Sequence, residues 1–212
     1  MITNDARVAW VLARDDGLRS QGVVSMDMAE LGVMVDCSAK GGVGSGTNAE
    51  YAAVHGAIQA MDVPRQSVGD FMNCRGTLST SSMQKATTMA ALSVSQIAAK
   101  RLPGFPKWSP ARQRMLYWVA LAAMERCWVI LHDVPEKLDH KQREEGRTLD
   151  EPWKIGKWLR GKHGQALDLK HWGEQWAKPW QLLQNVAFEL DDAGQIEIEA
   201  LLGIQRRMQK AS

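Results

Sequence analysis

The residues best placed to do chemistry are the lysines and arginines of two segments. Residues 71–124 carry seven basic residues and no acidic one, a net charge of +7, and residues 152–181 carry a net charge of +4. The segments around them are acidic, with net charges of −4 over residues 1–70, −3 over 125–151 and −2 over 182–212. Because clustered cations neutralise phosphates, this segregation indicates a polyanionic ligand.

In the first segment, five basic residues fall at the end of one expected helix, in the connection after it and at the start of the next. They are Lys100, Arg101, Lys107, Arg112 and Arg114. A helix-turn-helix module presents such positions to phosphates, and Gln96–Leu102 resembles its first helix over seven residues. The connection, residues 102–108, holds Pro103 and Pro106 and is longer than the compact turn of that module.

The second segment interleaves cations with tryptophans, a combination in which charges meet phosphates and flat rings stack on bases. We expect nucleic-acid contacts from Lys154, Lys157, Arg160, Lys162, His163 and Lys170. A protein partner would instead contact the rings of Trp153, Trp158, Trp172 and Trp176, since tryptophan is frequent in interface hot spots. Apolar residues at four-residue spacing usually face a core, so the stripe of Trp172, Trp176 and Trp180 also fits core packing.

These features predict a nucleic-acid-binding protein, with DNA favoured, of the bacterial or phage type that regulates transcription or replication. A protein-binding adaptor or inhibitor that uses the tryptophan-rich segment is the alternative. The basic residues could also form a solvated face that serves solubility alone. A structure can distinguish nucleic-acid binding from a merely solvated face by showing whether the two basic segments share one exposed surface.

Three patterns that could indicate an enzyme are weak. The glycine-rich stretch 40–47 lacks the lysine that a phosphate-binding loop places before its Ser or Thr, because Gly46 stands there. Glu136, His140 and Glu144 could share a helix face as metal ligands, but neighbouring lysines and arginines make ion pairs the better interpretation. None of the five histidines has a nucleophile context. We therefore expect a non-enzymatic protein without catalytic residues, metal or cofactor.

Composition indicates the size of the core and the cellular compartment of the protein. The 212 residues, 45% of them hydrophobic, suffice for a sizeable core. Cys37, Cys74 and Cys127 are odd in number and widely spaced, which is typical of a reducing compartment rather than a disulfide framework. The first residues lack the basic start and apolar run of a signal peptide, and no uninterrupted apolar stretch reaches spanning length. We expect a cytoplasmic protein that does not contact a membrane.

The elements that must position these residues are helices, so the expected fold is mainly α, an irregular multi-helix bundle. A short β element around residues 33–35 is allowed. The small polar residues at 73–82 predict a linker. It divides the chain into a helical or mixed segment, 1–76, and a helical domain, 83–212.

Capping and periodicity predict the individual helices. We expect them at 5–14, from a Thr47/Glu50 capping box to about 61, at 83–101, from the Ser109-Pro110 start through 131, as a short charged helix at 136–146, at 153–160, at 165–178 and from about 194. The last helix aligns Ile196, Ala200, Ile204 and Met208 on one face, a surface through which the chain could form a homo-oligomer.

Overall fold

The computed structural model describes residues 5–14, 51–132 and 149–211, and this part of the chain contains helices and no strand. The predicted mainly α, multi-helix architecture is therefore confirmed. Three expectations fall outside the described residues: the short β element around 33–35, the Thr47/Glu50 capping box and the charged helix at 136–146.

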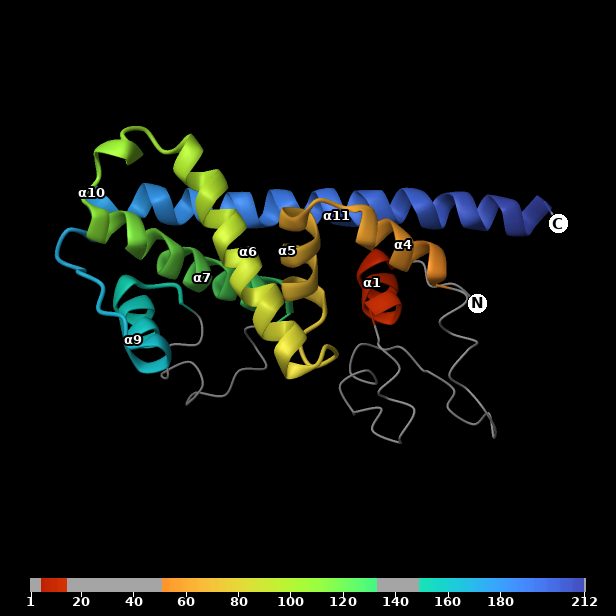
Figure 1. Cartoon of the computed structure of the whole chain (residues 1–212), viewed down its shortest axis with the longest axis horizontal. Helices are drawn as coiled ribbons and strands as arrows, with labels where there is room; N and C mark the ends of the chain where they lie inside the picture. The colour runs from red at the N-terminus through yellow and green to blue at the C-terminus, as the bar shows by residue number, and fades with distance from the viewer. Residues whose placement is uncertain (1–4, 15–50, 133–148, 212) are drawn as a thin grey trace.

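The helices are arranged around one long C-terminal helix (Figure 1). In chain order they are α1 (Ala6–Arg14), α4 (Ala52–Ala60), α5 (Val63–Asn73), α6 (Thr80–Arg101), the 3-10 turn η2 (Phe105–Lys107), α7 (Pro110–His132), α9 (Pro152–His163), α10 (Trp172–Gln175) and α11 (Ala177–Ala211). Helices α1 and α4 lie toward one end of the molecule and α9 and α10 toward the other (Figure 1).

Helix α11 connects these two ends. Its 35 residues span about 52 Å at 1.5 Å per residue, and it contacts α1, α4, α5, α6, α7 and α10. The predicted start at about Gly194 was wrong, because the helix begins at Ala177 and runs through this glycine. Pro179 is tolerated near the start, where backbone N–H groups have no partner within the helix.

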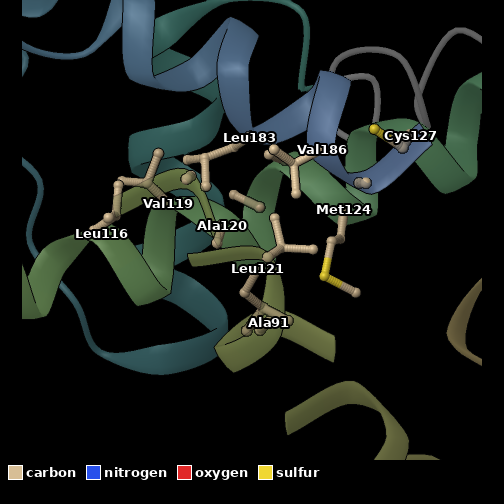
Figure 2. Close-up of a cluster of buried hydrophobic side chains, with 14 of the residues drawn as sticks. Ala91, Leu116, Val119, Ala120, Leu121, Met124, Cys127, Leu183 and Val186 are labelled. Atoms are coloured by element: carbon tan, nitrogen blue, oxygen red, sulfur yellow. The ribbon is translucent and has the colours of Figure 1, made fainter. Parts of the chain in front are cut away.

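The larger core lies where α6, α7 and α11 meet. Figure 2 shows Leu116, Val119, Leu121 and Met124 of α7 against Leu183 and Val186 of α11, with Ala91 of α6 below them. Small residues such as Ala120, Ala122 and Ala123 let the helices approach closely around α7. The prediction of a central buried helix is confirmed.

Helix α7 starts where the sequence indicates. The Ser109 hydroxyl accepts a hydrogen bond from the Arg112 backbone N–H at 3.3 Å, and Pro110 occupies the first helical position. By length and composition α7 could cross a membrane, although half of its most apolar stretch is buried against other helices. Whether the chain contacts a membrane stays untested.

A second core holds α1 against α4, α5 and α11, and Trp10 is its centre. The ring is fully buried between two glycines, Gly69 of α5 and Gly194 of α11. A Cβ on Gly69 would lie 2.3 Å from the ring and one on Gly194 would lie 3.1 Å from it, so both positions need glycine or a shifted ring. This close approach explains the glycine inside α11.

Buried carboxylates neutralise the cations of this second core. Asp70 accepts the indole N–H of Trp10 at 3.0 Å and also pairs with the Arg14 guanidinium. Asp191, fully buried on α11, lies 2.5 Å from the Arg7 guanidinium, whose other terminal nitrogen donates to Asn73 at 2.9 Å. Helices α1, α5 and α11 are thus joined by paired charges as well as apolar contacts.

Two other helix predictions differ from the structure. No helix was predicted between the one that ends at about 61 and the one at 83–101, but α5 lies there. Pro64 stands in its first turn, which the Asp62 side chain caps by accepting the Arg65 N–H at 3.0 Å. The helix predicted at 165–178 is wrong, since residues 164–171 are not helical and only the four-residue α10 follows before α11.

In the apolar stripe predicted on the C-terminal helix, the side chains that the structure describes face solvent. Ile196 is 65% exposed, and Ala200 and Ile204 are also exposed, whereas Ile198 and Leu202 are buried in the second core. Homo-oligomer formation through this stripe stays a prediction.

Candidate nucleic-acid interface

Helix α9 packs against the larger core through a short apolar face. Ile155 and Leu159 are buried in the larger core, and a Cβ on Gly156 between them would lie 2.9 Å from the Leu169 side chain. Pro152 occupies the first turn, and Gly164 ends the helix in the left-handed conformation with φ of 65°. The docking face fixes which side of α9 is left to solvent.

The solvent side of α9 is cationic. Trp153, Lys157 and Arg160 are exposed at helical spacing, and Lys162 in the last turn is exposed as well. Residues 152–163 contain no acidic side chain. Because lysines and arginines keep their charged ends in water while their stems lie along the helix, this side presents positive charge to a ligand.

Aromatic contacts join α9 to α7. The His163 ring lies with its centroid 5.3 Å from Trp118 of α7 and 4.9 Å from Trp158 of α9, and the Lys162 ammonium lies 5.4 Å from the Trp158 ring. Burial, and then the charge of Lys162, lower the pKa of His163 from its ordinary value, partly opposed by Glu125. This histidine is therefore neutral at pH 7 and serves as a packing ring beside the cations.

One member of the first basic segment lies on α7, the helix that α9 contacts through Trp118 and His163. Arg114 is exposed and precedes Trp118 by four residues, so it lies on the face of α7 that contacts His163. We call Arg114, Lys157, Arg160 and Lys162 the α7–α9 basic face. Among the described residues, none of these four side chains has an ion pair with a carboxylate.

The other end of the first basic segment lies elsewhere. Lys100, Arg101 and Lys107 are exposed around the connection between α6 and α7, which Figure 1 places on the opposite side of α7 from α9. Arg101 is paired with Glu189 of α11 at 2.6 Å. The first basic segment is thus divided: Arg114 lies on the face of α7 that contacts α9, and these three residues form a separate group.

Arg112 is held among rings rather than presented to solvent. Its guanidinium carbon lies 3.7 Å from the Trp108 ring centroid and 5.6 Å from that of Trp176, and it donates a hydrogen bond to the Gln175 carbonyl at 2.6 Å. Burial lowers its pKa. These contacts fasten the start of α7 to the segment before α11, a structural use of a residue expected to contact nucleic acid.

Lys154 and Lys170 flank the α7–α9 basic face in sequence. Lys154 lies 2.6 Å from Asp150 and 3.3 Å from Glu151, and the hydrogen bond to Asp150 raises its pKa. Lys170 is exposed in the connection after α9, where its backbone N–H donates to Asp168 at 3.0 Å. The charge of Lys154 is already offset locally, whereas the side chain of Lys170 has no ion pair among the described residues.

The four tryptophans expected at a protein interface differ in exposure. Trp153 is 48% exposed, while Trp158 and Trp172 are half-buried against the larger core. Trp176 lies inside that core, where its ring meets Trp108 edge-on at 6.0 Å. In this structure the stripe of Trp172, Trp176 and Trp180 packs inward, which leaves Trp153 as the exposed ring of α9.

Sequence reasoning missed the buried carboxylates Asp70 and Asp191 and the cations they hold. Each acid follows apolar or small neighbours, a context in which a carboxylate needs a partner. The glycine-rich stretch 40–47 and the triad of Glu136, His140 and Glu144 lie outside the described residues. Within the described ranges, no group of three His, Cys, Asp or Glu side chains could hold a metal ion.

No protein-family model, curated protein or solved structure matches this chain.

Proposed function

We propose that this chain binds nucleic acid, with DNA favoured, through the α7–α9 basic face. The observation that carries the proposal is the exposure of Lys157 and Arg160 on the solvent side of a helix that has no acidic residue, with Lys162 exposed in its last turn. A rigid helix with cations along its open side suits a phosphate backbone, because each contact releases condensed counterions. In the cell the chain would regulate transcription or replication by binding, without catalysing a reaction.

The two exposed groups of cations would play unequal parts. The α7–α9 basic face supplies four side chains without carboxylate partners in the described part of the chain, whereas Arg101 in the other group is already paired. Lys100 and Lys107 would reach a second stretch of backbone on a long or bent ligand. Trp153 adds a flat ring for stacking on an unpaired base.

The test is the salt dependence of binding. Fluorescence anisotropy titrations of labelled duplex and single-stranded DNA at several salt concentrations give the slope of log affinity against log salt. Lys157→Ala and Arg160→Ala should each reduce that slope by about 0.9 for duplex and about 0.7 for single strands. Trp153→Ala should weaken single-strand binding with no change of slope.

Lys85→Ala is the matched control. Lys85 is an exposed lysine in the first turns of α6, and these turns lie apart from α9 in Figure 1. Its replacement by alanine lowers the net charge by one, as Lys157→Ala and Arg160→Ala do, but leaves the α7–α9 basic face unchanged. The slope should stay at the wild-type value. Absence of binding at low salt, or an equal loss in Lys85→Ala and Arg160→Ala, would contradict the proposal.

A protein-binding adaptor or inhibitor is the second candidate, and the exposed ring of Trp153 favours it. A partner would cover Trp153 and meet Lys157 one helical turn further on. A stoichiometric partner recovered from lysate after nuclease treatment, and lost with Trp153→Ala, would support this function over the first. Loss of every partner on nuclease treatment would support nucleic acid.

A further inference from the structure

We propose that the C-terminal half of α11 pairs with the same half of a second copy of this chain, in an antiparallel dimer. Figure 1 shows the last turns of α11 extending past α4, beyond every other described helix. Ile198 and Leu202 are buried in the second core, and Leu202 is the last buried side chain described on α11. The opposite side of the helix is therefore open. This surface lies at the end of the molecule away from α9, so the proposal does not rest on nucleic-acid binding.

A row of apolar and small residues follows this open side. Ala193, Ile196, Ala200 and Gly203 recur at steps of three and four residues, the spacing that keeps side chains on the contact face of a helix pair. We call these four residues the α11 seam. Ile196 is 65% exposed, Ala200 is exposed, and Ile204, which borders the seam, is 46% exposed. The seam thus offers apolar surface that a second helix can cover.

Gly203 is an independent sign of a close partner. It stands inside a helix, where glycine is less favourable than alanine. A Cβ on Gly203 would meet no atom of another described segment within 4 Å, whereas one on Gly194 would meet the Trp10 ring. Packing within the described part of the chain therefore does not account for this glycine. A partner helix does, because a glycine leaves room for a large side chain from the facing helix.

Charge along α11 sets the direction of the partner. Residues 189–199 contain five acidic residues and no basic one, whereas residues 200–212 contain three basic residues and no acidic one. Asp192, four residues before Ile196, and Arg207, four residues after Gly203, are both exposed. A parallel partner would place like charges opposite each other. An antiparallel partner places the acidic part of each helix against the basic part of the other, which favours this direction.

One register satisfies both the seam and the charges. With the two-fold axis midway between Ile196 and Gly203, each isoleucine lies over the glycine of the other copy. Asp192 then lies opposite Arg207 of the other copy, because this pair of positions is centred on the same point. The two Glu199 carboxylates flank the axis and oppose the contact. A seam of about four turns is shorter than a standard interface, so the dissociation constant should be on the order of 10 µM.

Sedimentation velocity of the full chain, from about 1 to 200 µM, measures this equilibrium. The wild type should pass from monomer to dimer as the concentration rises. Ile196→Glu places a charge in the seam, and Gly203→Met fills the space under the facing isoleucine, so each should weaken dimerisation at least about tenfold. Because methionine favours a helix more than glycine does, fraying of α11 cannot explain the second loss.

Ile130→Glu is the matched control, because Ile130 is an isoleucine on α7 that is 49% exposed and lies outside the seam. This variant should dimerise as the wild type does. A monomer at every concentration, unchanged dimerisation in Ile196→Glu, or equal losses in Ile196→Glu and Ile130→Glu would overturn the dimer.

Reversed charges test the direction. Asp192→Arg and Arg207→Asp should each weaken the dimer about tenfold, since each creates two repulsive pairs between antiparallel chains. The double variant restores opposite charges and should recover the wild-type affinity. In a parallel dimer the single reversals would exchange one like-charge pair for another and leave the affinity unchanged. That result, or a double variant as weak as the single ones, would overturn the antiparallel arrangement.

Discussion

At the α1 end of the molecule Arg7 and Arg14 lie against buried carboxylates, whereas at the α9 end Lys157 and Arg160 face solvent without any in the described residues. Both ends are helical and both carry cations, so composition does not distinguish them. The difference lies in burial. A cation that enters a core needs a fixed counter-charge, because desolvation is costly, while one in water keeps its charge for a ligand.

Arg112 marks the boundary between these two uses of positive charge. It is partly shielded from water by Trp108 and Trp176 and has a carbonyl and ring faces as partners in place of a carboxylate. Such contacts favour arginine over lysine, since the guanidinium is flat and weakly hydrated. The comparison of the two ends therefore predicts large stability effects at the α1 end and small ones on the α7–α9 basic face.

The largest expected effect is at Asp191. Asp191→Ala removes the buried counter-charge of Arg7 and should lower the free energy of unfolding by about 3 kcal/mol, the low end for a broken buried pair because the Arg7 side chain is 31% exposed. Asp192→Ala, the next residue but exposed, should change it by less than about 0.5 kcal/mol. Urea denaturation followed by circular dichroism measures both; equal effects would erase the contrast between buried and exposed charge.

A pair of glycines gives the next largest effect, with opposite signs at the two ends. Gly69→Ala drives a Cβ against the buried Trp10 ring and should destabilise the fold by about 2 kcal/mol. Gly161→Ala on α9 meets nothing within 4 Å and should stabilise it by up to about 1 kcal/mol, the helix propensity gained. Thermal unfolding of both variants decides this; a destabilised Gly161→Ala would mean that the open side of α9 is covered.

Much of the fold could be predicted because its signals are local. Ser109 and Pro110 mark the start of α7, and the apolar run after them indicates its burial, as observed. Helix α5 was missed although Asp62 and Pro64 form a valid start, because a proline is also common just after the end of a helix and α4 ends at Ala60. The full length of α11 was missed because Gly194 indicates a helix boundary in the sequence. Its reason inside the helix, the close packing of Trp10 from 184 positions earlier, is known only from the structure.

The candidate site was less predictable, because exposure depends on contacts between distant segments. Charge counting found the cations of α9, and their exposure follows from the docking of Ile155 and Leu159. It could not show that Arg112 is held under Trp176, 64 positions later, or that Arg101 pairs with Glu189. Sequence reports where charge is concentrated; packing decides which charges a ligand can reach.

The smallest expected effect tests the seam between α7 and α9 through His163. Burial lowers the pKa of its ring below the ordinary value near 6.5, so the unfolded chain binds a proton more readily than the folded one. The stability that this ring contributes is therefore complete above pH 6.5 and is lost as the pH falls through the folded pKa. Denaturation of the wild type at pH 7.5 and at pH values below 6.5 should show this loss, and an NMR titration should give the lowered pKa directly.

His163→Gln isolates this contribution, because His132, whose pKa burial also lowers, is present in both proteins. The variant should lose less stability than the wild type over the same pH interval, and the difference between the two is the share of His163. An ordinary pKa for His163 would mean that Trp118 and Trp158 do not enclose the ring in solution. The contact of α7 with α9 would then be looser, and the α7–α9 basic face would reduce to the cations of α9 alone.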